Sequence, residues 1–398
     1  MRYYFVLIFL TTGLFSWAAE EGTTDRAARP NILWLTTEDI SPNLGCYGDL
    51  DASSPTLDLL ATKGTRYSRA FSTAGVCAPS RTSLITGLYA SSLGAQHMRC
   101  QATLPDAIRT LPTILRGAGY YCSNREKQDY QFEAPAGMWD ESSHVAHWRK
   151  RAPGQPFFSV FNFMTTHESR MRFPRAAFLK LTQRLTPEQA HDPAKVHLPA
   201  WLPDTPAVRV EWARYHDLIS AMDHQVATLL EQLERDNLAD DTIVIFTSDH
   251  GAGLPRAKQF VYESGLRVPL IVHVPDKWQE LMPTDRGLTS EQLVSLMDLP
   301  PSILSLLELP IPQEMQGSAF LGPQAAQPRT HIYATRDRMD ERLDMSRTVS
   351  DGRFKYHRNY MPHLPHYPLL TYMDLLQTAQ EFRRLAASDE LTPGLALK

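Results

Sequence analysis

The sequence predicts an α/β fold in which a large, mainly parallel sheet is sandwiched by helices and followed by a smaller α+β part with an antiparallel sheet. Continuous apolar runs alternate with stretches of helical periodicity over residues 30–325, which is typical of strands buried on both faces. Short alternating segments that meet at an Asp-Gly pair replace this pattern over residues 326–398. With 398 residues, 43% of them hydrophobic, the chain is long enough for both parts.

The first residues have the pattern of a cleaved secretory signal. Arg2 precedes the apolar run 3–17, and small residues lie where a signal peptidase cuts. We assign residues 1–19 to this signal and expect a secreted or periplasmic protein, bacterial because the chain has no Asn-x-Ser/Thr glycosylation acceptor. An N-terminal anchor is the alternative, but the run is short for a membrane span, so we expect no stable membrane insertion after cleavage.

The expected strands and helices follow one another along the chain in the order of an α/β fold. Apolar runs predict strands at 31–37, 119–124, 156–164, 241–248 and 268–274. Proline starts, glycine stops and helical spacing predict helices at 55–64, 80–88, 208–236 and 289–308, the last broken at Pro300-Pro301. Residues 170–207 show no clear period and are expected to run over the surface. The C-terminal part is predicted to hold a hairpin at 346–359 and a helix at 375–387.

Potential metal ligands follow two of the predicted strands directly. Glu38 and Asp39 come after the first strand, and Asp249 and His250 follow another strand 210 residues later. Ligands gather at the carboxyl ends of parallel strands, so we expect these side chains at one rim. Either pair alone is ordinarily a helix cap or a solvated loop. Two pairs of crowded acids favour a divalent cation, Ca²⁺ or Mg²⁺ from the oxygen ligands, with Zn²⁺ or Mn²⁺ conceivable because of the histidine.

Cations and a histidine lie in segments predicted near the same rim. Arg81, Lys127 and Lys258 suit a tetrahedral oxyanion, either phosphate or sulfate, although a single lysine is ordinarily a solvated surface group. His167 follows the predicted strand 156–164 and is either a satisfied rim residue or the acid that protonates a leaving group. The net charge of −4 gives no reason to expect nucleic acid as a partner.

Cys77 opens the segment "CAPSRTSLITGLY" and has four possible roles: buried thiol, disulfide partner, metal ligand or nucleophile. The helix predicted from Ser80 would stabilise an anion nearby and lower the pKa of the thiol. The chain has four cysteines and no Cys-x-x-Cys pair, so a disulfide scaffold is not expected. A cysteine with proline, serine and arginine at this spacing is also the sequence that sulfatase maturation enzymes read.

With this motif the chain is similar to the type I sulfatases of the alkaline-phosphatase superfamily. The likeness extends over "RPNILWLTTEDISPNLGCYGD", "FSTAGVCAPSRTSLITGLY", "LGAQHMR", "NREKQDYQF", "NFMTTHES" and "IFTSDHGAGLPRAKQFVYESGLRVPLIV". The segments "TTEDISP", "LGAQHMR" and "NFMTTHES" resemble the sulfamidase-like, heparan-type branch of the family. The resemblance implies a hydrolase of sulfate esters or sulfamates, with N-sulfoglucosamine as the expected substrate, and a formylglycine-generating maturation enzyme as a partner.

The resemblance also implies the role of each site residue. Cys77 would be oxidised to formylglycine, whose hydrate is the nucleophile, and Arg81 would hold it. The implied ligands of a Ca²⁺ ion, beside residue 77 itself, are Glu38, Asp39, Asp249 and His250. Lys127 and Lys258 would bind the sulfate, and His167 would protonate the leaving group. For substrate binding we assign His97, Arg99 and Asp129; a structural pair at the end of the Cys77 helix is the alternative for His97 and Arg99.

The sequence departs from the family pattern at several positions. Glu38 stands where many members have Asp, His250 where many have Asn, and Asp129 where many have His. Residues after 390 do not resemble the segment that closes the small sheet in many members, so we expect a truncated C-terminal part or a more open pocket. The alternatives to a glycan sulfatase are an aryl or other carbohydrate O-sulfatase, a phosphatase or phosphodiesterase of the same superfamily, and an inactive sulfatase-like glycan-binding protein.

Overall fold

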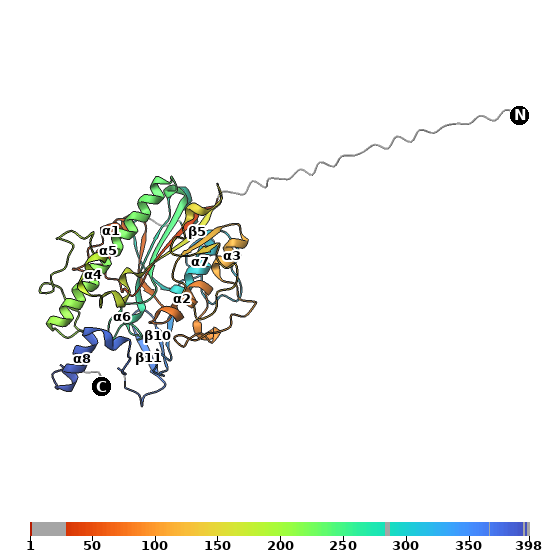
Figure 1. Ribbon diagram of the computed structural model, residues 1–398. Helices are drawn as coiled ribbons and strands as arrows, with labels where there is room; N and C mark the ends of the chain where they lie inside the picture. Colours follow the sequence, from red (N-terminus) through yellow and green to blue (C-terminus); the bar gives the residue numbers. More distant parts are fainter. Residues whose placement is uncertain (2–28, 283–286, 366, 393–394, 396–398) are drawn as a thin grey trace.

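The computed structural model describes residues 1, 29–282, 287–365, 367–392 and 395, and Figure 1 shows their arrangement. The signal predicted at residues 1–19 lies almost entirely outside this range. Eight strands form one sheet in the order β4-β3-β5-β1-β6-β7-β2-β8. These strands are β1 (Asn31–Thr37), β2 (Thr65–Phe71), β3 (Tyr121–Arg125), β4 (Glu141–Ser142), β5 (Phe157–Phe163), β6 (Thr242–Ser248), β7 (Arg267–His273) and β8 (Thr289–Ser295).

The sheet is mostly parallel, which confirms the predicted fold class. Among the described strands of this eight-stranded sheet, only β7 is antiparallel to its two neighbours, β6 and β2. The central strand β1 pairs in parallel with β5 on one side and β6 on the other, and Thr37 lies opposite Ser248 in this register. The carboxyl ends of β1, β5 and β6 therefore meet at one rim of the sheet.

Helices cover both faces of the sheet, which explains the continuous apolar runs. On one face, Leu33 and Leu35 of β1 pack in a core with α1 (Pro55–Lys63), α4 (Arg175–Leu181) and α5 (Pro206–Arg235). On the other face, Ile32 and Trp34 pack with α2 (Cys77–Thr86), α3 (Leu111–Gly117) and α7 (Leu299–Leu306). Figure 1 shows α1, α4 and α5 on one side of the sheet and α2, α3 and α7 on the other.

The C-terminal part carries the small antiparallel sheet that the Asp-Gly pair predicted. Its strands are β9 (Ile332–Arg336), β10 (Ser346–Ser350) and β11 (Lys355–Asn359), in the order β11-β10-β9. Gly352 has φ +87° in the turn between β10 and β11, a conformation that glycine adopts without a side-chain clash. Helix α8 (Gln377–Ala387) packs Phe382 into the core shared with α5. The domain boundaries at 325/326 stay a prediction.

Three predicted elements need correction. The helix predicted over 289–308 is wrong in its first half, because 289–295 forms β8 and the helix begins only at Leu299. Pro300 and Pro301 fall in its first turn, where a missing N–H removes no intrahelical bond, so they start this helix rather than break it. The helix predicted from Ser80 begins at Cys77, and the excursion at 170–207 contains the short helix α4. Strand β2, helix α3 and strand β9 have no counterpart among the predicted elements.

The four cysteines, all within the described residues, are unpaired. Among the described residues, no helix combines the length and the apolar character that a membrane span requires.

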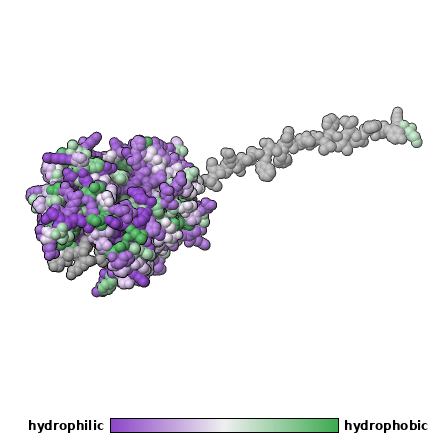
Figure 2. Space-filling view, turned by 60° about the horizontal axis from the view of Figure 1, so that its bottom comes forward, coloured by the Kyte–Doolittle hydropathy of each residue, from purple (hydrophilic) through white to green (hydrophobic). Residues whose placement is uncertain are grey.

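Figure 2 shows the face of the molecule that lies at the bottom of Figure 1. Hydrophilic residues dominate this face, and apolar residues form small separate groups on it. The remaining short helix, α6 (Glu263–Leu266), leads into β7.

Candidate active site

The four predicted metal ligands lie together at the carboxyl ends of β1 and β6. Glu38 and Asp39 follow β1 directly, and Asp249 and His250 follow β6. The parallel register of the two strands places these pairs side by side, and the backbone N–H of Asp39 donates to Asp249 Oδ1 at 3.2 Å. All four residues are fully buried. The structure thus brings together what the sequence places 210 positions apart.

Cys77 is the first residue of α2 and faces this cluster. Its Sγ lies 3.4 Å from His250 Nε2, and the residue is only 2% exposed. Pro79 lies in the first turn of the helix, where proline is tolerated, which is why the helix starts earlier than its sequence predicts. Burial raises the pKa of the Cys77 thiol, but Lys127 and Lys258 outweigh burial and leave this pKa below its ordinary value.

Arg81 projects from the second turn of α2 and ties three elements together. Its Nε donates to Asp249 Oδ2 at 3.1 Å, and its Nη1 donates to Asn162 Oδ1 of β5 at 2.8 Å. Its Nη2 is ion-paired with Glu38 Oε1. A guanidinium that is 4% exposed and bonded on three sides has one orientation, so Arg81 fixes the geometry around Cys77.

Two lysines complete the positive charge of the site. Lys127, which follows β3, is ion-paired with Glu38 and lies 3.4 Å from Asp129 Oδ2. Lys258 is buried, and its Nζ lies 2.9 Å from Asp39 Oδ2 and 3.1 Å from Glu168 Oε2. Both lysines are close enough to Cys77 to lower the pKa of its thiol, so an anion bound at Cys77 would meet both charges.

His167 lies beyond the end of β5 and belongs to the same cluster as Glu38 and Cys77. Its Nδ1 accepts a hydrogen bond from the backbone N–H of Ser169 at 3.3 Å, so the neutral ring carries its proton on Nε2. Burial lowers the pKa of His167, while the negative charge of Asp39 opposes this shift. The neutral ring therefore holds a proton that Nε2 can donate.

The carboxylates at the rim have the donor set of a cation site. One oxygen from each of Glu38, Asp39 and Asp249 lies within 4.8 Å of the others. Burial and the negative charge of Glu38 raise the pKa of Asp249 to about 7, whereas Arg81 and Lys127 outweigh burial at Glu38, and Lys258 with the two histidines outweighs it at Asp39, so the pKa of each of these two carboxyl groups lies below its ordinary value. Buried oxygens crowded in this way fit a hard divalent cation.

His250 gives a second reason to place a cation here. Its Nδ1 lies 2.9 Å from the carbonyl oxygen of Gly251, which can only accept, so Nδ1 carries a proton. In the neutral ring Nε2 then holds a lone pair, yet it lies 2.9 Å from Asp39 Oδ1. Two acceptors at this distance require a positive charge between or beside them: a proton, a metal ion, or the ammonium group of Lys258, which lies 3.0 Å from Asp39 Oδ1. The residues present therefore fit a metal.

The three residues predicted to bind substrate are placed differently from one another. Asp129 lies between Lys127 and Arg99 and is ion-paired with both. His97 Nδ1 accepts from the backbone N–H of Arg338 at 3.3 Å, which ties His97 to the C-terminal part. Neither His97 nor Arg99 ends α2, because Gly87 in the left-handed conformation does so. Arg99 and Asp129 are thus near the site, and the substrate-binding role of His97 stays a prediction, with its Nδ1 occupied by a contact to the C-terminal part.

Two residues of the site were missed by the sequence analysis. Glu168 is buried beside Lys258, and its backbone N–H donates to Asp39 Oδ2 at 2.7 Å. Asn162 holds Arg81 from the carboxyl end of β5. A polar side chain inside an apolar strand was a signal for Asn162. Nothing separated Glu168 from an ordinary loop acid.

Two family models match the chain. The model described as "Sulfatase" matches residues 30–309, and the model described as "N-sulphoglucosamine sulphohydrolase, C-terminal" matches residues 256–379. An ulvan-active sulfatase of Formosa agariphila is 40% identical over 91% of this chain and 66% of its own length. Human N-sulphoglucosamine sulphohydrolase is 29% identical over 72% of this chain and 62% of its own length. The chain thus spans slightly less than two thirds of the length of these relatives.

Solved structures share the fold at low sequence identity. A structure described in complex with its substrate D-glucosamine-2-N,6-O-disulfate has a TM-score of 0.65 and 18% identity, covering 91% of this chain and 95% of its own. A phosphonate monoester hydrolase from Silicibacter pomeroyi has a TM-score of 0.66 and 17% identity, covering 93% and 97%. One fold therefore serves both sulfate and phosphonate chemistry, and the site residues must decide between them.

Proposed function

We propose that this chain, which belongs to the sulfatase family, hydrolyses sulfate esters or sulfamates on sulfated glycans. The observation that carries the proposal is the position of Cys77. Its thiol lies at the start of α2 against a cluster of buried carboxylates, with Arg81, Lys127 and Lys258 around it. A phosphatase of the same fold would ordinarily have serine or threonine at this position, so the cysteine favours sulfate over phosphate.

The proposed nucleophile derives from Cys77 after oxidation to formylglycine by a maturation enzyme. The hydrated aldehyde supplies a hydroxyl that attacks sulfur, and a divalent cation, Ca²⁺ in our proposal, supplies charge that stabilises the sulfuryl oxygens. Glu38, Asp39, Asp249 and His250 would hold this ion. Asn162 and the two carboxylates bonded to Arg81 keep the guanidinium in place beside residue 77.

The chain's own cations and His167 perform the remaining tasks. Lys127 and Lys258 are held by carboxylates, so their ammonium groups are positioned before the sulfate arrives and can stabilise its negative charge. Nε2 of His167 carries the proton for the leaving group. A sulfamate leaves as an amine, which needs this proton more than an activated aryl oxygen does.

The glycan has two candidates, each favoured by a separate observation. The 40% identity to an ulvan-active sulfatase over 91% of the chain favours a sulfated polysaccharide such as ulvan. The match of residues 256–379 to the C-terminal model of N-sulphoglucosamine sulphohydrolase favours N-sulfoglucosamine in a heparan-type glycan. Arg99 and Asp129, at the edge of the site, would contact the sugar in either case.

The test is ion chromatography of sulfate released from ulvan oligosaccharides and from N-, 2-O-, 3-O- and 6-O-sulfated saccharides. We expect release from ulvan or from N-sulfoglucosamine, and weaker release from nitrophenyl sulfate. His167→Ala should slow the sugar reaction far more than the nitrophenyl reaction. Release from the other O-sulfated saccharides only would contradict both candidates, and an absence of release from every substrate would contradict the sulfatase activity itself.

The modification at Cys77 has its own measurement. After expression with a maturation enzyme, the peptide that contains residue 77 should lose about 18 Da, as thiol-to-aldehyde conversion requires. Cys77→Ala should abolish turnover. Multiple turnover by an enzyme with an unmodified thiol would refute the formylglycine proposal.

We also propose export from a bacterial cell, which the apolar run at residues 3–17 supports. Sequencing the N-terminus of the mature protein tests this proposal.

A further inference from the structure

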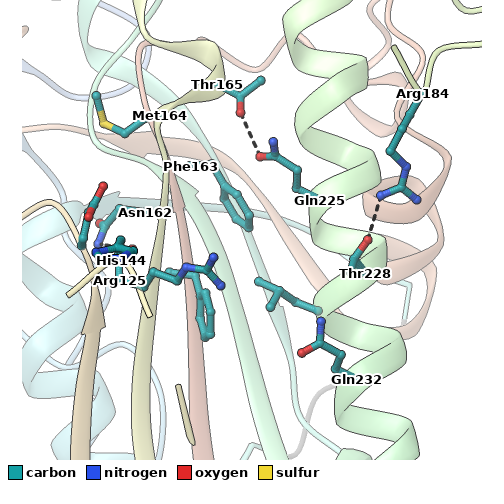
Figure 3. Close-up of a pocket in the computed structure, with 13 residues that line it drawn as sticks. Arg125, His144, Asn162, Phe163, Met164, Thr165, Arg184, Gln225, Thr228 and Gln232 are labelled. Carbon is teal, nitrogen blue, oxygen red and sulfur yellow. Dashed lines mark hydrogen bonds between the residues drawn. The ribbon is translucent and has the colours of Figure 1, made fainter. Parts of the chain in front are cut away.

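A cavity of about 540 Å³ opens between α5 and the β3–β5 edge of the sheet, next to the active site. Figure 3 shows Asn162, Phe163 and Met164 on its sheet side, and Gln225, Thr228 and Gln232 of α5 on the opposite side. Its size suits one or two sugar units, since small-molecule sites range from about 300 to 1,000 Å³. Of its lining residues, Asn162 alone was placed in the active site above, where it holds Arg81.

The cavity is joined to the active site through two chain segments and one side chain. Arg125 and Glu126 of its lining immediately precede Lys127, and Met164 and Thr165 precede His167 by a few residues. The lining residue Asn162 accepts from Arg81 and donates to the carbonyl oxygen of Arg125 at 3.2 Å. A glycan that places its sulfate at Cys77 can therefore extend over this edge into the cavity.

The lining carries more positive than negative charge, and it also offers hydrogen-bond donors. Arg125 stacks 5.9 Å from the centre of the Phe161 ring, and Arg184 donates to Thr228 Oγ1 at 2.9 Å. Within the described residues neither arginine has an ion-pair partner, and Glu126 is the one carboxylate among the lining residues. The oxygens of Gln225 and Gln232 accept from Thr165 and His147, so their amide nitrogens are left as donors.

A second large cavity differs from the cavity beside α5 in the charge of its lining residues. It measures about 530 Å³ and is lined by Asp49, Asp51 and Glu263 as well as by Arg256 and Arg267. Its acids and bases are nearly balanced, so it has no preference for an anion. The cavity beside α5 has two arginines against one exposed glutamate, and it therefore favours a negatively charged ligand.

We propose that the cavity beside α5 binds the anionic group, a carboxylate or a second sulfate, of a sugar next to the one whose sulfate is cleaved. Arg125 and Arg184 would contact this group, and the two amide nitrogens would bind sugar hydroxyls. The apolar floor of Phe161, Phe163 and Leu229 suits the C–H face of a sugar ring. This inference rests on the proposed glycan sulfatase activity and adds a preference for acidic oligosaccharides over single sulfated sugars.

The kinetic test compares substrates that reach the cavity with one that does not. Arg125→Gln and Arg184→Gln are assayed with ulvan and heparin tetrasaccharides and with nitrophenyl sulfate; Arg235→Gln, an exposed arginine at the end of α5, is the matched control. Each cavity variant should raise KM for the cleaved tetrasaccharide about tenfold to a hundredfold, typical of one charge-assisted hydrogen bond. Nitrophenyl sulfate kinetics should not change. Equal effects on both substrates, or none on the tetrasaccharide, would overturn the proposal.

A binding measurement separates this inference from the activity on which it rests. Calorimetry with the Cys77→Ala protein measures affinity for the same tetrasaccharides, for the corresponding disaccharides and for carboxyl-reduced tetrasaccharides. Tighter binding of a tetrasaccharide, lost in Arg125→Gln, supports the cavity even if no sulfate is released. Loss of affinity on carboxyl reduction identifies a carboxylate, and retention identifies a sulfate. Equal affinity for tetrasaccharide and disaccharide, or no binding of either glycan, would overturn the proposal.

Discussion

Glu168 is a buried carboxylate that lies beside Asp39 and contacts the same cation, Lys258. Lys258 Nζ lies 3.1 Å from Glu168 Oε2 and 2.9 Å from Asp39 Oδ2, so the ammonium group is fixed between two acids. Burial raises the pKa of Glu168 to about 7, although Lys258 counteracts part of that shift. Glu168 is therefore a positioning residue for a cation that we assign to sulfate binding.

We expect Glu168→Gln to weaken sulfate binding more than it slows the chemical step. The amide keeps the shape of the side chain but removes the negative charge 3.1 Å from Lys258 Nζ, so KM should rise about tenfold, which corresponds to about 1.4 kcal/mol of lost electrostatic interaction. Steady-state kinetics on the best sulfated saccharide measure KM and kcat separately. Glu263→Gln removes an exposed carboxylate paired with Lys355 and serves as the control. An unchanged KM in Glu168→Gln would refute the positioning role.

Among single residues, the sequence predicted those site residues that directly follow a predicted strand. Glu38, Asp39, Asp249 and His250 could be placed at one rim because each pair follows an apolar strand. Asn162 and Glu168 could not, because their roles depend on which side chains lie opposite them in space. The contact of His97 with the backbone N–H of Arg338 also could not be predicted, because the two residues lie 241 positions apart in the sequence.

Among the elements, α5 supplies buried carboxylates to the starts of two other helices. Asp223 accepts from the backbone N–H groups of Thr56 and Leu57 at 3.0 and 2.9 Å, at the start of α1. Glu211 accepts from those of Gln377 and Thr378 at 3.1 and 2.8 Å, at the start of α8. Each carboxylate satisfies N–H groups that no intrahelical partner can satisfy. One long helix thus anchors both the N-terminal region and the C-terminal part.

The attachment of α8 should depend on Glu211. Glu211→Gln leaves one of the two buried N–H groups without an acceptor, which should lower the free energy of unfolding by about 1–3 kcal/mol. Urea denaturation measures this loss, and hydrogen exchange should show faster exchange at Gln377 and Thr378. Glu231→Gln, on the exposed face of the same helix, is the matched control. Equal stability of the two variants would contradict the anchoring role.

The segment before α5 is held by a histidine whose charge makes stability depend on pH. His191 Nδ1 lies 2.8 Å from Asp217 Oδ1 of α5. Burial lowers the pKa of His191, but Asp217 and the carbonyl of Asp51 outweigh burial and raise this pKa above its ordinary value. Because the folded pKa is raised, the stabilisation is complete below the unfolded pKa, about 6.5, and is lost as pH rises through the folded pKa.

We therefore expect the Tm advantage of the natural protein over His191→Gln to be largest near pH 5 and to shrink above neutrality. Thermal unfolding from pH 5 to pH 9 measures it. His331→Gln, which removes an exposed histidine outside this segment, should show no such trend. A difference between the natural protein and His191→Gln that grows with pH would mean that the sign of the coupling is wrong.

Strands and helices were predicted correctly where the hydrophobic pattern of a segment fitted only one kind of element. The strands at 31–37 and 156–164 and the long helix were found because both their length and their period were clear. The segment 289–295 was misassigned because "TSEQLVS" precedes an apolar stretch with which it forms one apparent helix, and only its pairing with β2 makes it a strand. The strand β2 itself, "TRYSRAF", has polar positions at the sheet surface and so lacks the apolar run of a central strand.

For the molecule as a whole, the cation proposed at the rim would join the two central strands of the sheet. β1 and β6 are neighbours, and their last residues lead directly into Glu38, Asp39 and Asp249. Without a cation these buried carboxylates repel one another, as the raised pKa of Asp249 indicates. A ligand that binds only the folded state stabilises it by about 2.7 kcal/mol when its free concentration is a hundred times its Kd.

We therefore expect metal removal to lower stability as well as activity. EDTA should lower the Tm by several degrees and abolish sulfate release, and added Ca²⁺ or Mg²⁺ should restore both. Asp249→Ala should remove the response of the Tm to Ca²⁺, because it deletes a ligand at the end of β6. Asp351→Asn, in the exposed β10–β11 turn, should keep the full response. Because Tm is measured without substrate, it separates the ion's effect on folding from its effect on chemistry. An identical Tm in EDTA and in Ca²⁺ would show that Arg81, Lys127 and Lys258 alone balance the buried carboxylates.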